Sequence, residues 1–112
     1  MKQKRESAYR KALRELVPLA SLADFEAILA IALRGHLRHL PPSIAAWQAV
    51  TTLARHEYTD YDRLLAEGYD TDAARHFVLA EINAQLERWD CSRRLKTADL
   101  SPDRSTVPRA GR

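Results

Sequence analysis

Apolar residues recur along this 112-residue chain in separate blocks, at the three- and four-residue spacing of helices. The first block covers residues 6 to about 16, and Pro18 ends it. The second starts at Ser21, which suits an N-cap, and runs to about residue 33 or 36. Asp24 is expected to reach back to this cap as a short-armed capping box. The two apolar faces are expected to contain Tyr9, Ala12, Leu13, Leu16, Phe25, Ile28, Leu29 and Ala32.

A third helix is predicted to begin at Pro42, because proline suits the first turn of a helix and breaks the one before it. It ends near His56, and its expected apolar stripe comprises Ile44, Trp47, Val50 and Leu53 or Ala54. Thr59 and Asp62, three positions apart, then resemble the cap of a short helix that stops at Gly68.

The last helix is predicted to be the longest, from a cap at Asp70 or Thr71 to about Asp90. Its stripe comprises Ala74, Phe77 or Val78, Ile82, Leu86 and Trp89. Without a convincing strand pattern or repeat, the chain is expected to be all-α, a compact bundle of four to five helices. Past residue 91 the periodicity ends, which predicts one domain over residues 1–91 and a flexible, disordered basic tail over 92–112.

The net charge of +3 is unevenly distributed. Residues 1–16 and 92–112 each carry six Lys or Arg against two Asp or Glu, whereas residues 17–91 carry six against eleven. Basic ends favour phosphate contacts through counterion release, although they also occur as solubilising tails. We predict a non-enzymatic module that binds nucleic acid or an acidic protein, with nucleic acid favoured. The candidate contact residues are Lys2, Lys4, Arg5, Arg34, Arg38, Arg93, Arg94 and Lys96.

The single cysteine, Cys91, leaves no partner for an intramolecular disulfide or a thiolate metal site. The charged N-terminus lacks the features of a secretory signal, and the most apolar run, residues 25–33, is too short to cross a bilayer. We therefore expect a cytoplasmic protein with no membrane contact and no cofactor. A homodimer is the alternative assembly, because a small helical domain can leave an apolar groove exposed.

Ionisable and aromatic side chains crowd residues 55–65, at the join between two predicted helices. As a hydrolase or nuclease site, His56 would titrate near neutrality, Asp62 would orient it or serve as a base, and Tyr61 would donate a hydrogen bond, with Arg75 as the fourth member of the site. As a structural corner, Asp62 caps a helix, Tyr61 packs its ring, and Arg75 pairs with Asp62 or Asp60. We favour the structural interpretation, because small helical domains contain many capped corners and few active sites.

His36 and His39 are spaced as a weak metal-ligand pair, which His56 or Asp60 could complete. They lie among arginines beside Gly35, and the exposed polar face of a basic turn explains them as well. We therefore predict no metal site.

Residues 55–62 read Arg-His-x-x-Thr-x-Tyr-Asp, and the chain there resembles a family known as domain of unknown function 2293. The likeness continues through Leu64, Gly68, Ala74-Arg75 and residues 86–89, so it covers about residues 45–90 and leaves out the basic ends. The family's activity is not established. The resemblance therefore implies a domain assignment and no catalytic roles.

Overall fold

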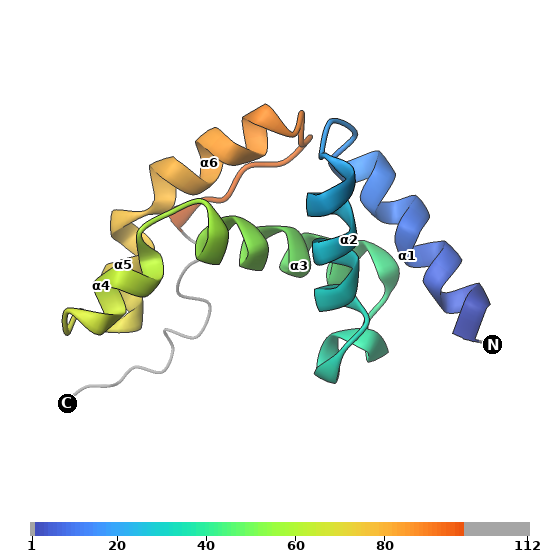
Figure 1. The fold of residues 1–112 in the computed structure, drawn as a ribbon, viewed down its shortest axis with the longest axis horizontal. Helices are drawn as coiled ribbons and strands as arrows, with labels where there is room; N and C mark the ends of the chain where they lie inside the picture. Colours follow the sequence, from blue (N-terminus) through green and yellow to red (C-terminus); the bar gives the residue numbers. More distant parts are fainter. Residues whose placement is uncertain (1, 98–112) are drawn as a thin grey trace.

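The chain forms helices and connecting turns throughout the part that the computed structural model describes (Figure 1). The described part is residues 2–97, without the side chains of Lys2, Gln3 and His36. The helices are α1 (Lys2–Leu16), α2 (Leu22–Ala32), α3 (Pro42–Glu57), α4 (Tyr61–Ala66), α5 (Thr71–Phe77) and α6 (Leu79–Arg88), with a 3-10 helix η1 (Gly35–His39) between α2 and α3. The structure is 73% helical, and the predicted all-α bundle is confirmed.

Helix α3 is the centre of the fold and the longest of the described helices, with 16 residues. It packs against α1 and α2 in its first half and against α4 and α6 toward its end (Figure 1). The predicted apolar stripe of α3 is partly wrong, because Ile44 is 45% exposed and Trp47 is only partly buried. Val50 and Ala54 are fully buried as predicted, and the other fully buried positions are Ala45, Ala46 and Ala49. Small side chains in adjacent rows let two helices approach α3 closely, which the larger residues would prevent.

The helix starts follow local chemistry where a side chain can reach a free backbone amide. Ser21 accepts a hydrogen bond from the Asp24 amide at 3.1 Å, and Asp70 accepts one from the Ala73 amide at 2.8 Å. Pro42 occupies the first turn of α3. These three predicted starts are confirmed, because each depends on residues that lie within one turn of one another.

Two predicted caps are wrong in detail. The Asp24 carboxylate turns away from its own helix start and accepts hydrogen bonds from the Tyr58 hydroxyl at 2.7 Å and the Trp89 indole at 3.2 Å. Thr59 accepts a hydrogen bond from the Tyr61 amide at 3.1 Å, but Asp62 bonds to His56 instead of completing the cap. In both cases a side chain from a neighbouring turn or helix outcompetes the local backbone.

The last predicted helix is interrupted at Val78, so that α5 and α6 are two helices. Val78 turns into the core with 1% of its surface exposed, whereas Phe77 is 63% exposed and packs its ring edge-on against Tyr69. No glycine or proline marks this break in the sequence. The apolar stripe is otherwise as predicted, since Ala74, Ile82, Leu86 and Trp89 are all buried.

Residues 91–97 run back along the bundle after α6 (Figure 1). Cys91 and Leu95 are buried, and the Asn83 side chain accepts a hydrogen bond from the Leu95 amide at 2.7 Å and donates one to its carbonyl at 3.0 Å. The first six residues of the predicted tail are thus held against the fold. Residues 98–112 lie outside the described part.

Candidate functional sites

The predicted corner between α3 and α4 brings His56 and Asp62 together. The His56 Nδ1 atom lies 2.7 Å from an Asp62 carboxylate oxygen, and the two side chains are 42% and 60% exposed. An aspartate at Nδ1 fixes the imidazole tautomer and leaves Nε2 toward solvent, as in a general base. Because both groups face water, their attraction is screened and the pair is only weakly held.

Tyr61 is the buried member of this corner, with 4% of its surface exposed. The His56 ring meets it edge-on, with centroids 5.4 Å apart and planes at 84°, and the Arg55 guanidinium lies 5.1 Å from its ring centroid. Tyr61 therefore serves as a packing platform for the His56 ring and the Arg55 guanidinium. A proton-donating role, which the sequence left open, would require its buried hydroxyl end to meet a substrate.

Arg75 does not pair with Asp62 or Asp60, so the predicted ion pair is wrong. Within the described residues Asp60 pairs with Arg63 at 2.9 Å, and Asp62 pairs with His56. Burial lowers the pKa of the Arg55 guanidinium, and the nearby charge of Arg75 lowers it further. The Nε atoms of both arginines are buried without a hydrogen-bond partner. Two like charges are therefore held close together at the corner, and the nearby Tyr61 and Asp62 offset only part of the resulting cost in free energy.

The basic residues at the start of the chain lie against those of η1. The Arg5 guanidinium donates to the Arg38 carbonyl and to the Tyr9 hydroxyl. Tyr9 in turn is buried and donates toward the carbonyls of Leu37 and Leu40, at 3.2 and 3.0 Å. These contacts fix η1 beside α1, so two basic segments that lie 28 to 33 residues apart in sequence become neighbours.

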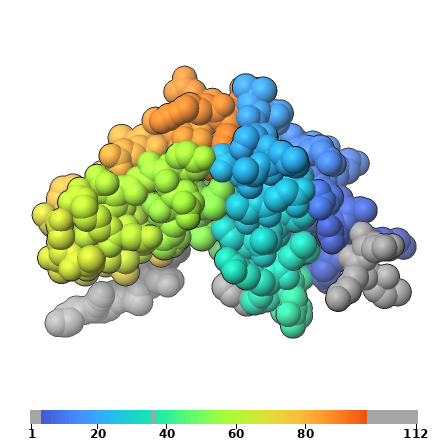
Figure 2. Space-filling view, viewed as in Figure 1, coloured from blue at the N-terminus to red at the C-terminus, as the bar shows by residue number. Residues whose placement is uncertain are grey.

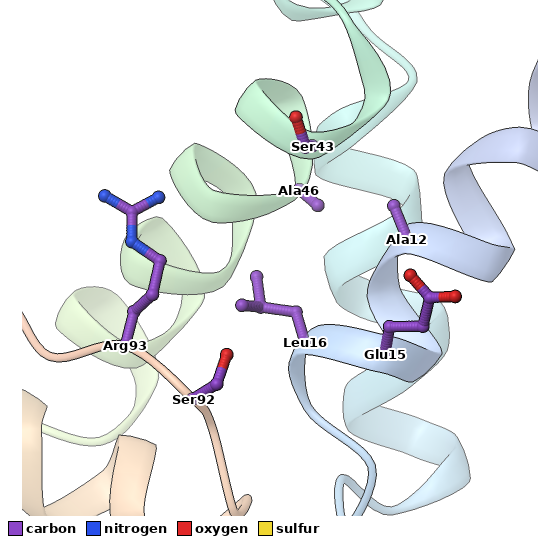
Figure 3. A pocket seen from close by; sticks show the side chains of 7 residues that line it. All are labelled: Ala12, Glu15, Leu16, Ser43, Ala46, Ser92 and Arg93. Carbon is purple, nitrogen blue, oxygen red and sulfur yellow. The ribbon is translucent and has the colours of Figure 1, made fainter.

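A third basic segment reaches α1 from the end of the chain. A pocket of about 210 Å³ lies between α1, α3 and residues 92–93 (Figure 3). Its apolar lining comes from Ala12, Leu16 and Ala46, and its polar lining from Glu15, Ser43, Ser92 and Arg93. The Arg93 guanidinium also stacks on Trp47, 4.0 Å from the ring centroid. Residue 93 is thus anchored on α3, directly across the pocket from α1.

Most candidate contact residues remain available to a partner. We use the term α1 cations for Lys4, Arg5, Arg34, Arg38, Arg93 and Arg94. Each is exposed, and none takes part in the ion pairs found among the described side chains. Arg94 donates to the carbonyls of Cys91 and Arg93, at 2.7 and 3.1 Å. Lys96 is exposed as well, and the side chain of Lys2 lies outside the described part.

Only one member of the predicted histidine pair, His39, has a described side chain. His39 is exposed at the end of η1, and the His36 side chain is not described. Among the described residues no group of three or more His, Cys, Asp or Glu side chains is placed to hold a metal ion. The same residues include no helix that is long and apolar enough to span a bilayer.

Sequence reasoning missed the hydrogen-bonded hub at Asp24. Its carboxylate on α2 holds Tyr58 at the end of α3 and Trp89 at the end of α6, and the two rings meet edge-on with centroids 5.7 Å apart. The backbone adds a bond from the Leu19 amide to the Trp89 carbonyl at 3.1 Å. Two signals were available in the sequence: Asp24 is a carboxylate in the first turn of a helix, and the Trp89 indole needs a hydrogen-bond acceptor when it is buried. The sequence does not reveal that these two residues meet.

Cys91 behaves as a buried structural thiol. Its side chain is 5% exposed, and burial raises the pKa of the thiol despite the nearby Arg93 and Arg94. A raised pKa lowers the thiolate fraction at neutral pH, so the group is a poor nucleophile.

Comparison with protein-family models matches residues 12–90 to a family described as "Uncharacterized conserved protein (DUF2293)". The match begins within α1, well before the residues on which the sequence resemblance was based, and it ends just after α6. Comparisons with curated proteins and with solved structures give no match.

Proposed function

The chain belongs to the uncharacterized conserved protein family DUF2293, and from this premise we propose that its helical domain is a non-enzymatic binding module that contacts nucleic acid through the α1 cations. One observation carries the proposal: the basic start of α1 and two basic segments that are far from it in sequence meet along this helix. Arg5 reaches the backbone of η1 at one end of the helix, and Arg93 lines a pocket with the other end.

The charge arrangement supports a polyanionic partner. An exposed cation that forms no ion pair can neutralise a phosphate, which releases condensed counterions from the nucleic acid. By contrast, a cation that already bonds to carboxylates, such as Arg10 with Glu6 and Glu26, has little left to offer. The α1 cations are of the first kind. Residues 57–77, with six Asp or Glu against two Arg, would repel the same partner and so orient it.

The proposal is tested by titrating the full chain against labelled duplex and single-stranded oligonucleotides over a series of salt concentrations. Binding that depends on phosphates must weaken steeply with salt, by a slope of about 0.9 per contact on a duplex. Failure to bind either probe at low salt would remove the proposal.

A matched pair of variants locates the contact. Arg38→Gln and Arg63→Gln each remove one positive charge, the first at η1 and the second on α4, where Arg63 already bonds to Asp60 and Glu67. We expect Arg38→Gln to weaken binding to all sequences and to reduce the salt slope by about one. Arg63→Gln should leave both quantities unchanged. An equal effect of the two substitutions would show that binding follows net charge and has no defined site.

The contact between His56 and Asp62 favours a second candidate function, a hydrolase or nuclease that uses His56 as a general base. This candidate predicts that His56→Ala abolishes turnover of an oligonucleotide while the fold and the binding affinity are retained. The binding module predicts no turnover by the unchanged protein, so incubation of a labelled strand with the chain separates the two.

A further inference from the structure

The pocket beside α1 has features that phosphate contacts leave unexplained. Its floor is apolar, whereas its rim carries the carboxylate of Glu15 on one side and the guanidinium of Arg93 on the other (Figure 3). The carboxylate on the rim repels phosphate, so the anionic backbone of a nucleic acid is a poor occupant. A group that is flat, uncharged and polar at its edge suits this lining better.

Arg93 presents a stacking surface at the pocket. One face of its guanidinium lies on the Trp47 ring, 4.0 Å from the centroid, and the side chain as a whole is exposed. The contact with Trp47 restrains the planar group, and the same side chain lines the pocket. Nucleobases that are not paired in a helix stack on arginine planes and aromatic rings in this manner.

Glu15 supplies a hydrogen-bond acceptor across the pocket. It is exposed and forms none of the ion pairs found among the described side chains. A carboxylate accepts well from the exocyclic amine of cytosine, a donor that thymine lacks. The pocket volume of about 210 Å³ is below the roughly 300–1,000 Å³ of sites for drug-sized ligands, which fits one base.

We propose that this pocket receives one unpaired base of a single-stranded nucleic acid, stacked on Arg93 above Trp47, with Glu15 accepting a hydrogen bond from the exocyclic amine of the base. This inference rests on the proposed nucleic-acid binding and narrows it to single strands. A base in a duplex is stacked and paired on both sides, so it does not enter the pocket.

The first test compares four probes on the unchanged full chain at one low salt concentration. The probes are oligo-dC, oligo-dT, a strand of the same length without bases, and a duplex. We expect oligo-dC to bind about threefold more tightly than oligo-dT, and the strand without bases to bind about tenfold more weakly than oligo-dC. Quenching of tryptophan fluorescence should accompany the two strands that carry bases and not the strand that lacks them.

The second test uses substitutions that conserve charge. Arg93→Lys keeps the positive charge but removes the plane, and Arg63→Lys makes the same exchange on α4, where Arg63 bonds to Asp60 and Glu67. We expect Arg93→Lys to lose about tenfold in affinity for oligo-dC and to keep the duplex affinity, whereas Arg63→Lys changes neither. Glu15→Gln should narrow the difference between oligo-dC and oligo-dT.

The outcomes separate this inference from the proposed function. Equal affinity for all four probes, or an Arg93→Lys variant that binds oligo-dC as well as the unchanged chain, overturns the base pocket and leaves phosphate binding intact. Absence of binding to every probe at low salt overturns both. The four-probe comparison needs no substitution, so it decides the question even where a variant fails to fold.

Discussion

The two ends of the molecule treat their charges differently. At the α4 and α5 end, His56 bonds to Asp62, and Arg63 bonds to both Asp60 and Glu67, so several exposed charges are satisfied within six residues. At the end formed by α1 and η1, which lies on the opposite side of the molecule (Figure 2), Arg10 bonds to Glu6 and Glu26, but the described ion pairs include none of Lys4, Arg5, Arg34 and Arg38. Charges that pair internally brace a helix end, whereas charges without a partner are available to a ligand. This difference, more than net charge, suggests which end meets nucleic acid.

Among the substitutions considered, the largest loss of stability is expected at the Asp24 carboxylate on α2, which connects the two ends of the molecule. It bonds to Tyr58 and Trp89, which lie at the ends of the two helices that lead to the other half of the molecule. Asp24→Ala leaves the buried Trp89 indole without an acceptor, so we expect a loss of about 2 kcal/mol in unfolding free energy. That corresponds to a fall of about 8–16 °C in the melting temperature of a domain of this size, measured by circular dichroism.

Asp24→Asn is the matched control, because it keeps one acceptor oxygen and removes the charge. We expect a smaller loss than for Asp24→Ala. If Asp24→Ala unfolds within about 0.5 kcal/mol of the unchanged chain, which is the range of ordinary surface substitutions, then Asp24 does not hold the halves together.

The next largest change in stability is expected at Arg75. It lies at the α4 and α5 end but forms none of the ion pairs described there. Its Nε atom is buried without a partner, and it lies close to Arg55, whose charge has the same sign. Arg75→Met removes the repulsion and keeps an apolar stem. We expect unfolding free energy to stay the same or to rise by up to about 1 kcal/mol in urea titrations. A loss of more than about 1 kcal/mol would show that Arg75 has a favourable partner in solution.

A weaker effect is expected for the pair of His56 and Asp62. Both side chains are exposed, so a double-mutant cycle with His56→Ala and Asp62→Ala should give a coupling energy of about 0.5 kcal/mol or less. Nucleic-acid affinity should not change, because this pair belongs to the end whose charges are satisfied. A coupling energy above about 2 kcal/mol would mark the pair as desolvated and would revive the interpretation as an active site.

The sequence predicts those features of the fold that depend only on residues within one helical turn of one another. Ser21, Pro42 and Asp70 start helices where expected, since a cap needs only its own next residues. The interruption at Val78 is different, because no local breaker causes it. Which of Phe77 and Val78 turns inward is decided by the helices packed around them, and sequence left that choice open.

The candidate sites show the same division. Sequence located the crowded corner and the basic ends, because charge and residue type are visible without coordinates. It did not predict that Arg75 would lie by Arg55 and not Asp62, or that Arg93 would cross the bundle to stack on Trp47. These contacts join residues 20 or more positions apart, and many alternative pairings are compatible with the same pattern.

The smallest expected effect is a pH dependence of the unfolding free energy, caused by the bond between Tyr58 and Asp24. The hydrogen bond to Asp24 raises the pKa of the Tyr58 phenol, and burial and the Asp24 charge raise it further. A group whose pKa is higher in the folded than in the unfolded state contributes stability below its unfolded pKa, about 10 for tyrosine, and this contribution is lost as pH rises through the folded value. Unfolding free energy should therefore fall above about pH 10.

Tyr58→Phe isolates this contribution, because the variant and the unchanged protein have all other ionisable groups in common. We expect the unchanged chain to be the more stable at pH 8, and its advantage over Tyr58→Phe to shrink as pH rises from about 10 to 11 in urea titrations. Tyr58 is 43% exposed, which keeps the difference small. An advantage that stays constant through pH 11 would mean that the phenol does not bond to Asp24 in solution. Asp24 would then hold the other half of the molecule through the Trp89 indole, beside the backbone bond from Leu19 to Trp89.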